Sequence, residues 1–426
     1  MPDLGDLPAA RPLPATVRRE ARRRVQAGLT PRSGRAVVGA VALAAAVLVV
    51  PLGAAGLMAG SERQGTPAAG ADSGEFQPFP SEQRFAARDG APEEAARRCT
   101  AAGGEESAGW QPVLTVAARG VTVVAYRTGS GTRFCELTPA TVALSATASG
   151  TGATQVTYVS ALGTVAGVTD PAVREVTVAD PDAPGSMTMT GDPAVTRDGV
   201  FVLPNTFSAT VASLRVTAGP ATLSWEPADL PRAVTPRIDR PQAAGDLSSV
   251  TGRELAGCLG AATPPVVDPR AWQPGATLTL NDSESIVLGH YQGLLAVCVR
   301  RGAPGVPGAP TVTVDDGGAG SGSRSSEADE NAFFFTRTVF YDFRAEAQGG
   351  SASDTVAITG LVKDPRVAAV SISRAHRAPV TATVTGGTFV LPGIGLNEGT
   401  GPDGDRSRIT ALDAHGRPLG SALIST

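Results

Sequence analysis

The strongest constraint on the fold is a set of six sequence landmarks that occurs twice in the same order. Each set contains a cysteine, Trp-Gln-Pro, a second cysteine, Asp-Pro, a pair of aliphatic β-branched residues and Gly-x-Phe-Val-Leu-Pro. The first set runs from Cys99 to Pro204 and the second from Cys258 to Pro392. The first three landmarks lie 11 and 25 residues apart in the first set, against 14 and 26 in the second. Collinear landmarks at such similar spacing predict an internal duplication.

The duplication divides most of the chain into two predicted modules. Module 1 spans residues 93–226 and module 2 spans residues 246–426, with a Pro-rich joint at 227–245 between them. The spacing from the second cysteine to Asp-Pro is 35 residues in module 1 and 66 in module 2. The surplus is mostly the Gly-, Ser- and Asp-rich stretch 300–331, which we expect to be a flexible insertion.

Each module has the local pattern of a small helix followed by strands. The stretches "PEEAARRCTAA" and "TGRELAGCLGAA" surround the first cysteine of each module and predict short helices opened by acidic or capping residues. Three alternating segments follow, separated by Gly-rich or polar turns, and the rest of each module continues as strands. The predicted fold class is therefore α+β and β-rich, in two duplicated modules.

An uncharged segment precedes the modules. Residues 36–61 carry no charge and, as a helix, exceed the roughly 30 Å hydrocarbon core of a bilayer. We expect a transmembrane helix here; a cleaved signal peptide is the alternative, disfavoured by the length of the apolar run and of the segment before it. Residues 62–92 are rich in Pro, Gly and polar side chains and are expected to form a stalk.

The charge of the N-terminal tail predicts the orientation of the chain. Residues 1–35 hold eight arginines and only three acidic residues, so the tail is expected to stay in the cytoplasm and to lie against anionic lipid. Docking of a cytoplasmic partner on the tail is an alternative. Gly56 and Gly60 form a small-xxx-small pair, which leaves open a homodimer through the transmembrane helix.

The part of the chain beyond the tail is acidic. It contains 28 basic and 37 acidic residues, so its net charge repels nucleic acid, and no nucleic-acid partner is expected. The predicted localisation is a single-pass membrane protein with a cytoplasmic N-terminus and an extracytoplasmic C-terminal region.

The four cysteines, Cys99, Cys135, Cys258 and Cys298, all lie in the extracytoplasmic region, where disulfides persist. Of the three possible connectivities, we predict Cys99 with Cys135 and Cys258 with Cys298, because a duplicated unit should carry its own disulfide. A metal site is not expected, since no C-x-x-C spacing occurs.

The sequence contains no recognisable catalytic or cofactor motif. Nucleophile-elbow, H-E-x-x-H, phosphate-loop and dinucleotide-binding patterns are all missing. The three histidines, His290, His376 and His415, all follow module 1, which excludes a duplicated His-based site. A Ser-His-Asp site assembled from distant residues stays open. Asp403 and Asp405 lie in a Gly-rich loop that we interpret as a solvated turn rather than a calcium site.

An aromatic run in module 2 is the best candidate partner surface. The stretch "AFFFTRTVFYDF" at 332–343 holds six aromatic residues and is expected to be mostly core. If it lies on a sheet edge, it offers a surface for a partner; the candidate residues are Phe333, Phe335 and Tyr341.

The combination of a Cys-bearing helix, Trp-x-Pro, a meander ending in Cys and a terminal "ALDAHGRPLG" segment resembles uncharacterised membrane-anchored or secreted proteins of high-GC Gram-positive bacteria. The resemblance covers residues 93–426 and transfers no catalytic residue. Some similar proteins look like companions of extracytoplasmic-function sigma factors, which implies envelope signalling. The tail here is short and has no His or Cys for the zinc motif of anti-sigma factors.

The sequence therefore predicts a non-enzymatic envelope protein that presents two disulfide-linked modules for binding or sensing. Its expected partner is an envelope protein or a cell-wall ligand, with no cofactor. The alternatives are an extracytoplasmic hydrolase and a structural anchor for another envelope protein.

Overall fold

The computed structural model describes the greater part of residues 85–424. The described ranges are 85–149, 152–181, 191–208, 213–226, 228–282, 284–301, 310–315, 333–341, 354–374, 377–392 and 407–424. They belong to one compact unit. The predicted tail and transmembrane segment, and all but the end of the predicted stalk, lie outside the described residues. Neither α-helix in the described part has the length and apolar character of a membrane span.

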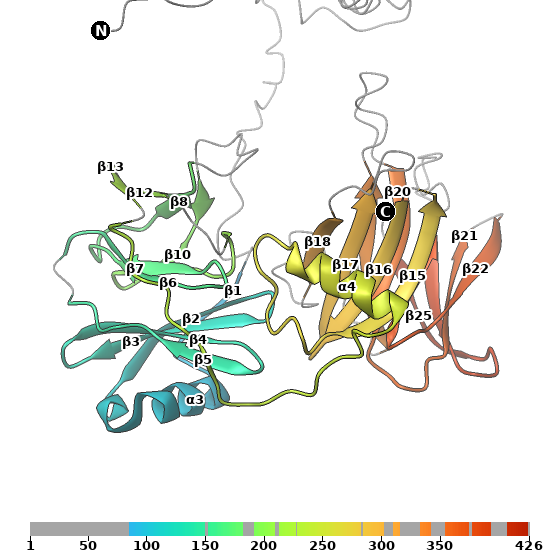
Figure 1. The fold of residues 1–426 in the computed structure, drawn as a ribbon, viewed down its shortest axis with the longest axis horizontal. Coiled ribbons are helices and arrows are strands. Elements are labelled where there is room, and N and C mark those ends of the chain that lie inside the picture. The colour runs from blue at the N-terminus through green and yellow to red at the C-terminus, as the bar shows by residue number, and fades with distance from the viewer. Residues whose placement is uncertain are drawn as a thin grey trace, which may run out of the picture. The chain divides into compact units, whose positions relative to one another are not determined.

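The described chain is β-rich, with two α-helices of 11 residues each (Figure 1). The first half contains β1 (Ala86–Asp89), α3 (Glu93–Gly103), the 3-10 helix η2 (Gly104–Ser107), β2 (Gln111–Ala118), β3 (Val121–Thr128), β4 (Gly131–Leu137), β5 (Thr141–Leu144), β6 (Gln155–Val159), β7 (Val165–Val168), β8 (Val176–Ala179), β9 (Asp192–Pro193), β10 (Val195–Arg197), β11 (Val200–Leu203), β12 (Leu214–Ala218), β13 (Ala221–Trp225) and β14 (Arg237–Ile238).

The second half repeats the helix and the strands in the same sequence. It contains α4 (Val250–Gly260), β15 (Gln273–Asn281), β16 (Glu284–Tyr291), β17 (Leu294–Arg301), β18 (Pro310–Asp315), β19 (Phe334–Tyr341), β20 (Asp354–Val362), β21 (Ala369–Arg374), β22 (Arg377–Thr383), β23 (Thr388–Pro392), β24 (Ser407–Leu412) and β25 (Pro418–Ile424).

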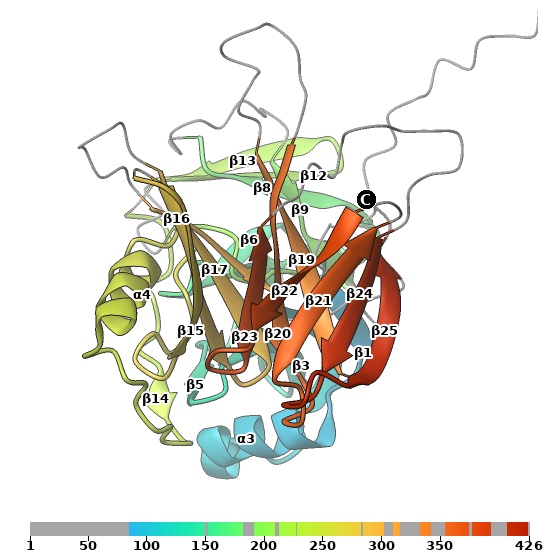
Figure 2. The ribbon, with the colours of Figure 1, turned by 90° about the vertical axis from the view of Figure 1, so that its right-hand side faces the viewer.

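The sheets of the two halves have the same strand order. The meander β2-β3-β4-β5 corresponds to β15-β16-β17-β18, and β6-β7-β11 corresponds to β19-β20-β23. The third sheet, β13-β12-β8-β9, corresponds to β25-β24-β21-β22, whose strands lie side by side in Figure 2. All pairings between these strands are antiparallel. The repeat of landmarks along the sequence thus corresponds to a repeat of three sheets.

Three short strands lie outside the places expected for strands. β1, at the end of the predicted stalk, pairs with β2, and β14, in the predicted joint, pairs with β5. β18 lies in the stretch 300–331, expected to be flexible, and pairs with β17. The β-branched run Thr311–Val314 explains β18, because such side chains favour extended backbone.

The twice-written Phe-Val-Leu-Pro forms a buried strand beside a glycine in each half. Phe201 in β11 lies opposite Gly167, and Phe389 in β23 lies opposite Gly360. A Cβ atom on Gly167 would come within 2.6 Å of the Phe201 ring, so the ring occupies the space that the glycine leaves. Both phenylalanines are fully buried. The motif is therefore structural: in module 1 the ring covers the strand glycine, and in module 2 the equivalent Phe389 lies opposite a strand glycine.

The two halves share polar and apolar contacts. The carboxylate of Asp268, in the loop before β15, accepts hydrogen bonds from the Thr138 hydroxyl at 3.0 Å, the Ala140 amide at 3.1 Å and the Tyr291 hydroxyl at 2.9 Å. Burial raises the pKa of the Tyr291 hydroxyl, and the Asp268 carboxylate raises it further. Gly120, in the turn after β2, packs against Leu294. Because these contacts cross between the halves, independent folding of each module stays a prediction.

Candidate functional site: an arginine-lined groove

Both disulfides join the helix of a module to the third strand of its meander. Cys99 in α3 bonds Cys135 in β4, and Cys258 in α4 bonds Cys298 in β17. The pairing agrees with the prediction of one disulfide per module. All four half-cystines are buried, so these bonds act as structural cross-links that hold a helix on a sheet.

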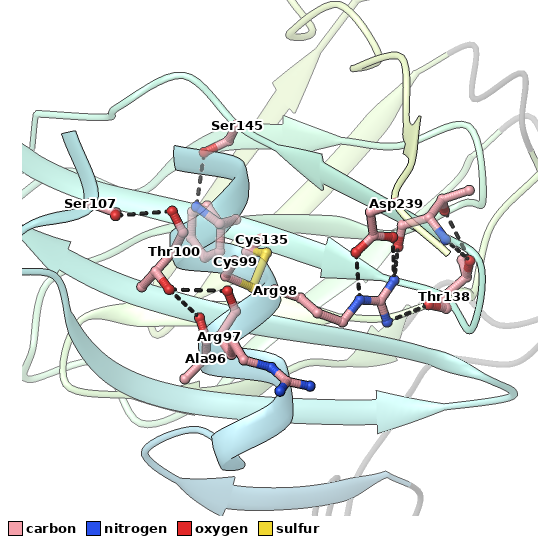
Figure 3. The surroundings of a disulfide bond; sticks show 12 residues. Ala96, Arg97, Arg98, Cys99, Thr100, Ser107, Cys135, Thr138, Ser145 and Asp239 are labelled. Carbon is pink, nitrogen blue, oxygen red and sulfur yellow. Dashed lines mark hydrogen bonds and ion pairs between the residues drawn. A yellow bond between two sulfur atoms is a disulfide. The ribbon is translucent and has the colours of Figure 1, made fainter. Parts of the chain in front are cut away.

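An arginine next to the first disulfide fixes the end of the same meander (Figure 3). The Arg98 guanidinium donates to both carboxylate oxygens of Asp239, each at 2.7 Å, and to the carbonyls of Thr138 and Thr141. These bonds lower the pKa of Asp239. They attach the joint between the modules to the β4–β5 turn, so Arg98 has a structural role.

The described part of module 1 contains an open groove of about 780 Å³. It lies where the ends of β1, β2 and β3 meet the β10–β11 turn and the segment before β8. The lining is polar and contains three guanidinium groups. The lining residues are Asp89, Gly90, Gln111, Pro112, Val113, Arg127, Arg174, Thr196, Arg197 and Asp198.

Arg127 is held in place by two neutral acceptors. It lies near the end of β3, opposite Gln111 of the Trp-Gln-Pro landmark. Its guanidinium donates to the Thr132 hydroxyl at 3.0 Å and to the carbonyl of Asp198. Among the described residues no carboxylate pairs with it. Two hydrogen bonds therefore hold the Arg127 guanidinium, and no described carboxylate compensates its charge.

The β10–β11 turn supplies the second wall. Asp198 and Gly199 form this two-residue turn with φ of 47° and 72°, the backbone that Asp-Gly favours in tight hairpins. The turn presents the Asp198 carbonyl to Arg127. Directly before it, Arg197 forms an ion pair with Asp89 at the end of β1. This pair neutralises one guanidinium and ties β1 to the hairpin.

Arg174 completes the groove from the segment before β8. It follows a turn in which the Val173 amide donates to the Asp170 carbonyl at 2.9 Å. The side chain is exposed and, within the described ranges, has no carboxylate partner. Arg127 and Arg174 are therefore two guanidinium groups that line one groove and, in the part of the chain that the structure describes, have no paired carboxylate.

Module 2 has the same backbone at these three positions but no arginine. His290 lies opposite Gln273 as Arg127 lies opposite Gln111. Thr385 precedes the turn Gly386–Gly387 as Arg197 precedes Asp198–Gly199. Burial lowers the pKa of His290, which favours its neutral form.

The position of Arg174 also has a counterpart without positive charge in module 2. Val367 donates to the Asp364 carbonyl as Val173 does to Asp170, so Ala368 takes the place of Arg174. The basic groove is thus a feature of module 1 alone among the described residues. Since the backbones match, the shared fold does not require arginine at the positions of Arg127 and Arg174, whereas Arg197 pairs with β1, a strand without a counterpart in the described part of module 2.

Module 1 also buries a carboxyl group beneath its meander. Glu136 in β4 is 4% exposed, and burial raises its pKa, an effect partly offset by the hydroxyls of Thr164, Ser160 and Tyr158. One of its carboxyl oxygens has no hydrogen-bond partner. Val299 follows Cys298 as Glu136 follows Cys135, so the second module places an apolar side chain here.

The predicted partner surface lies on an edge strand. β19 pairs only with β20 in the described part of the chain. Phe333 precedes this strand, and its half-buried ring packs against Gly420 of β25. The side chains of Phe335 and Tyr341 lie outside the described part. The partner surface stays a prediction for all three residues.

Sequence reasoning did not find the groove. Arg127, Arg174 and Arg197 are dispersed over 70 residues and belong to no motif. An alignment of the two copies could have indicated the groove. In that alignment the three arginines of module 1 correspond to residues of module 2 that are neutral or only weakly basic. Asp403, Asp405 and His376 lie outside the described residues. No group of three or more His, Cys, Asp or Glu side chains suited to a metal ion occurs in the described ranges.

No family model matches the chain, and no curated protein matches it.

Proposed function

We propose that this chain is a membrane-anchored, extracytoplasmic protein that binds a ligand in the arginine groove of module 1. The observation that carries the proposal is the pair Arg127 and Arg174, two guanidinium groups at one groove that have no carboxylate partner among the described residues. Unpaired guanidiniums at a concave surface are typical of sites that recognise an anion. Module 2 then serves as a structural companion built on the same fold.

The composition of the groove favours binding over catalysis. Its lining offers hydrogen-bond donors, two carboxylates and amide or hydroxyl groups, and the described lining residues include no serine, histidine or cysteine that could form a nucleophile–base pair. The disulfides support an oxidising location, in which cross-links of this kind persist. The N-terminal anchor is the remaining part of the proposal and rests on the uncharged segment 36–61.

Ligand-dependent unfolding tests the binding function. Fractions of a cell-envelope extract should raise the melting temperature of the purified full-length protein. A ligand at 100 times its dissociation constant contributes about 2.7 kcal/mol. The same fractions should leave a variant with Arg127→His and Arg174→Ala unshifted. An equal shift in both proteins, or no shift with any fraction, would contradict the proposal.

The topology has its own test. An engineered cysteine at Ser73 should react with an impermeant thiol reagent on intact cells, and one at Thr16 should react only after lysis. Labelling of Thr16 on intact cells would overturn the orientation.

A further inference from the structure

We infer that the ligand of the arginine groove carries phosphate groups, one of which binds between Arg127 and Arg174. This inference rests on the proposed binding function and adds the chemical class of the ligand.

The charged side chains of the groove do not cancel. Arg197 and Asp89 neutralise each other, which leaves Arg127, Arg174 and the carboxylate of Asp198. The groove is therefore net positive, although the remainder of the chain beyond the tail is acidic. Positive charge concentrated in a concavity of an acidic protein attracts anions at short range, and ordinary salt screens it beyond about 10 Å.

The positions of the two guanidiniums favour a phosphate over a carboxylate. Arg127 comes from the end of β3 and Arg174 from the segment before β8, so the two guanidiniums line the groove from separate elements. One bidentate guanidinium contacts both oxygens of a carboxylate along a single edge of that planar group. A phosphate has additional oxygens around the same centre and accepts paired N–H donors from two directions. Two separate guanidiniums thus fit a phosphate better than a carboxylate.

The two modules carry different residues at the arginine positions. His290, Ala368 and Thr385 occupy the positions of Arg127, Arg174 and Arg197 on the same backbone. Arg197 is explained by its ion pair with Asp89 of β1, a strand with no counterpart among the described strands of module 2. A requirement of the shared fold for arginine at the other two positions would apply in both modules. Arg127 and Arg174 are therefore not explained by the shared fold, and an anionic ligand explains them.

The repeat also supplies substitutions that the fold accepts. Arg127→His and Arg174→Ala each introduce the residue found at the equivalent position of module 2. Arg215→Thr is the matched control, since Arg215 lies in β12 of module 1 and does not line the groove. Asp198→Asn removes the carboxylate and keeps a residue that favours the same turn.

The test is titration calorimetry of the full-length protein in neutral detergent with inorganic tripolyphosphate, and with citrate as the carboxylate probe. The wild type should bind tripolyphosphate more tightly than citrate. Arg127→His and Arg174→Ala should each weaken tripolyphosphate binding about tenfold or more, as expected for lost bonds to a charged group. Arg215→Thr should bind like the wild type. Asp198→Asn should bind about two- to fivefold more tightly, an effect that vanishes near 1 M salt.

The N-terminal tail also carries arginines, but it is identical in every variant, so the differences between variants report the groove. Competition by phosphatidylglycerol in the micelles would identify a lipid headgroup as the source of the phosphate; no competition would indicate a soluble or polymeric phosphate. Equal affinity of wild type and groove variants would overturn the inference, and so would tighter binding of citrate. If an envelope fraction still raises the melting temperature in an arginine-dependent way, the binding function survives and only the phosphate assignment fails.

Discussion

Removing either disulfide should destabilise the protein by a similar amount, because the two cross-links close loops of similar length. The bonded cysteines are 36 residues apart in module 1 and 40 in module 2. The chain-entropy relation gives about 3.8 and about 3.9 kcal/mol at 25 °C for these loops. The small difference follows from the weak logarithmic dependence on loop length. Each value is a large part of the stability of an ordinary domain.

Urea unfolding followed by tryptophan fluorescence measures the effect. Each double mutant that lacks one disulfide should have a free energy of unfolding about 4 kcal/mol below that of the wild type. The two double mutants are Cys99→Ala with Cys135→Ala, and Cys258→Ala with Cys298→Ala. The fully reduced wild type is the control that leaves the side chains in place, and its loss should approach the sum of the two. A loss below about 1 kcal/mol for either pair would refute the reasoning, and so would a strong difference between the pairs.

Three further predictions concern the core and the modules. Glu136→Gln should stabilise the protein at neutral pH. Because burial raises the pKa of Glu136, the wild type loses stability as the pH rises from about 4.3, the ordinary glutamate value, towards the folded-state pKa. The stability gained by Glu136→Gln should therefore shrink near pH 4. A stability difference that does not depend on pH would contradict this. Phe201→Ala and Phe389→Ala should each cost about 3–5 kcal/mol in thermal or urea unfolding, and a loss below 1 kcal/mol would show that the ring does not fill the strand glycine. A fragment of residues 85–242, which keeps β1 and β14, should melt more cooperatively in calorimetry than residues 93–226; equal melts would assign these strands no role.

The repeat explains why much of the fold could be predicted from sequence. A helix around each first cysteine and a three-stranded meander follow from local pattern, because alternation and turn residues act over a few positions. The disulfide pairing followed from requiring both copies to be alike. The strands β1 and β14 could not be predicted in the same way. They are short, lie next to Pro-rich or polar segments, and pair only because a sheet edge is present in three dimensions.

The groove illustrates the other limit. Arg127, Arg174 and Arg197 line one groove only when the sheets of module 1 assemble. Their spacing along the chain does not predict that they lie at the same site. The buried Glu136 is similar, since its strand reads as an ordinary alternating segment. Both features become visible when the two copies are compared position by position. The differences between the copies mark what folding alone does not require.

The most direct test of the binding account is photocrosslinking in living cells from the two Trp-Gln-Pro landmarks. A photoreactive phenylalanine analogue at Gln111 lies in the groove, and the same analogue at Gln273 occupies the equivalent position of module 2. We predict a crosslinked ligand from position 111 alone, lost when Arg127→His and Arg174→Ala are added. Equal crosslinking from both positions, or a product that persists without the arginines, would contradict the assignment of the groove as the binding site.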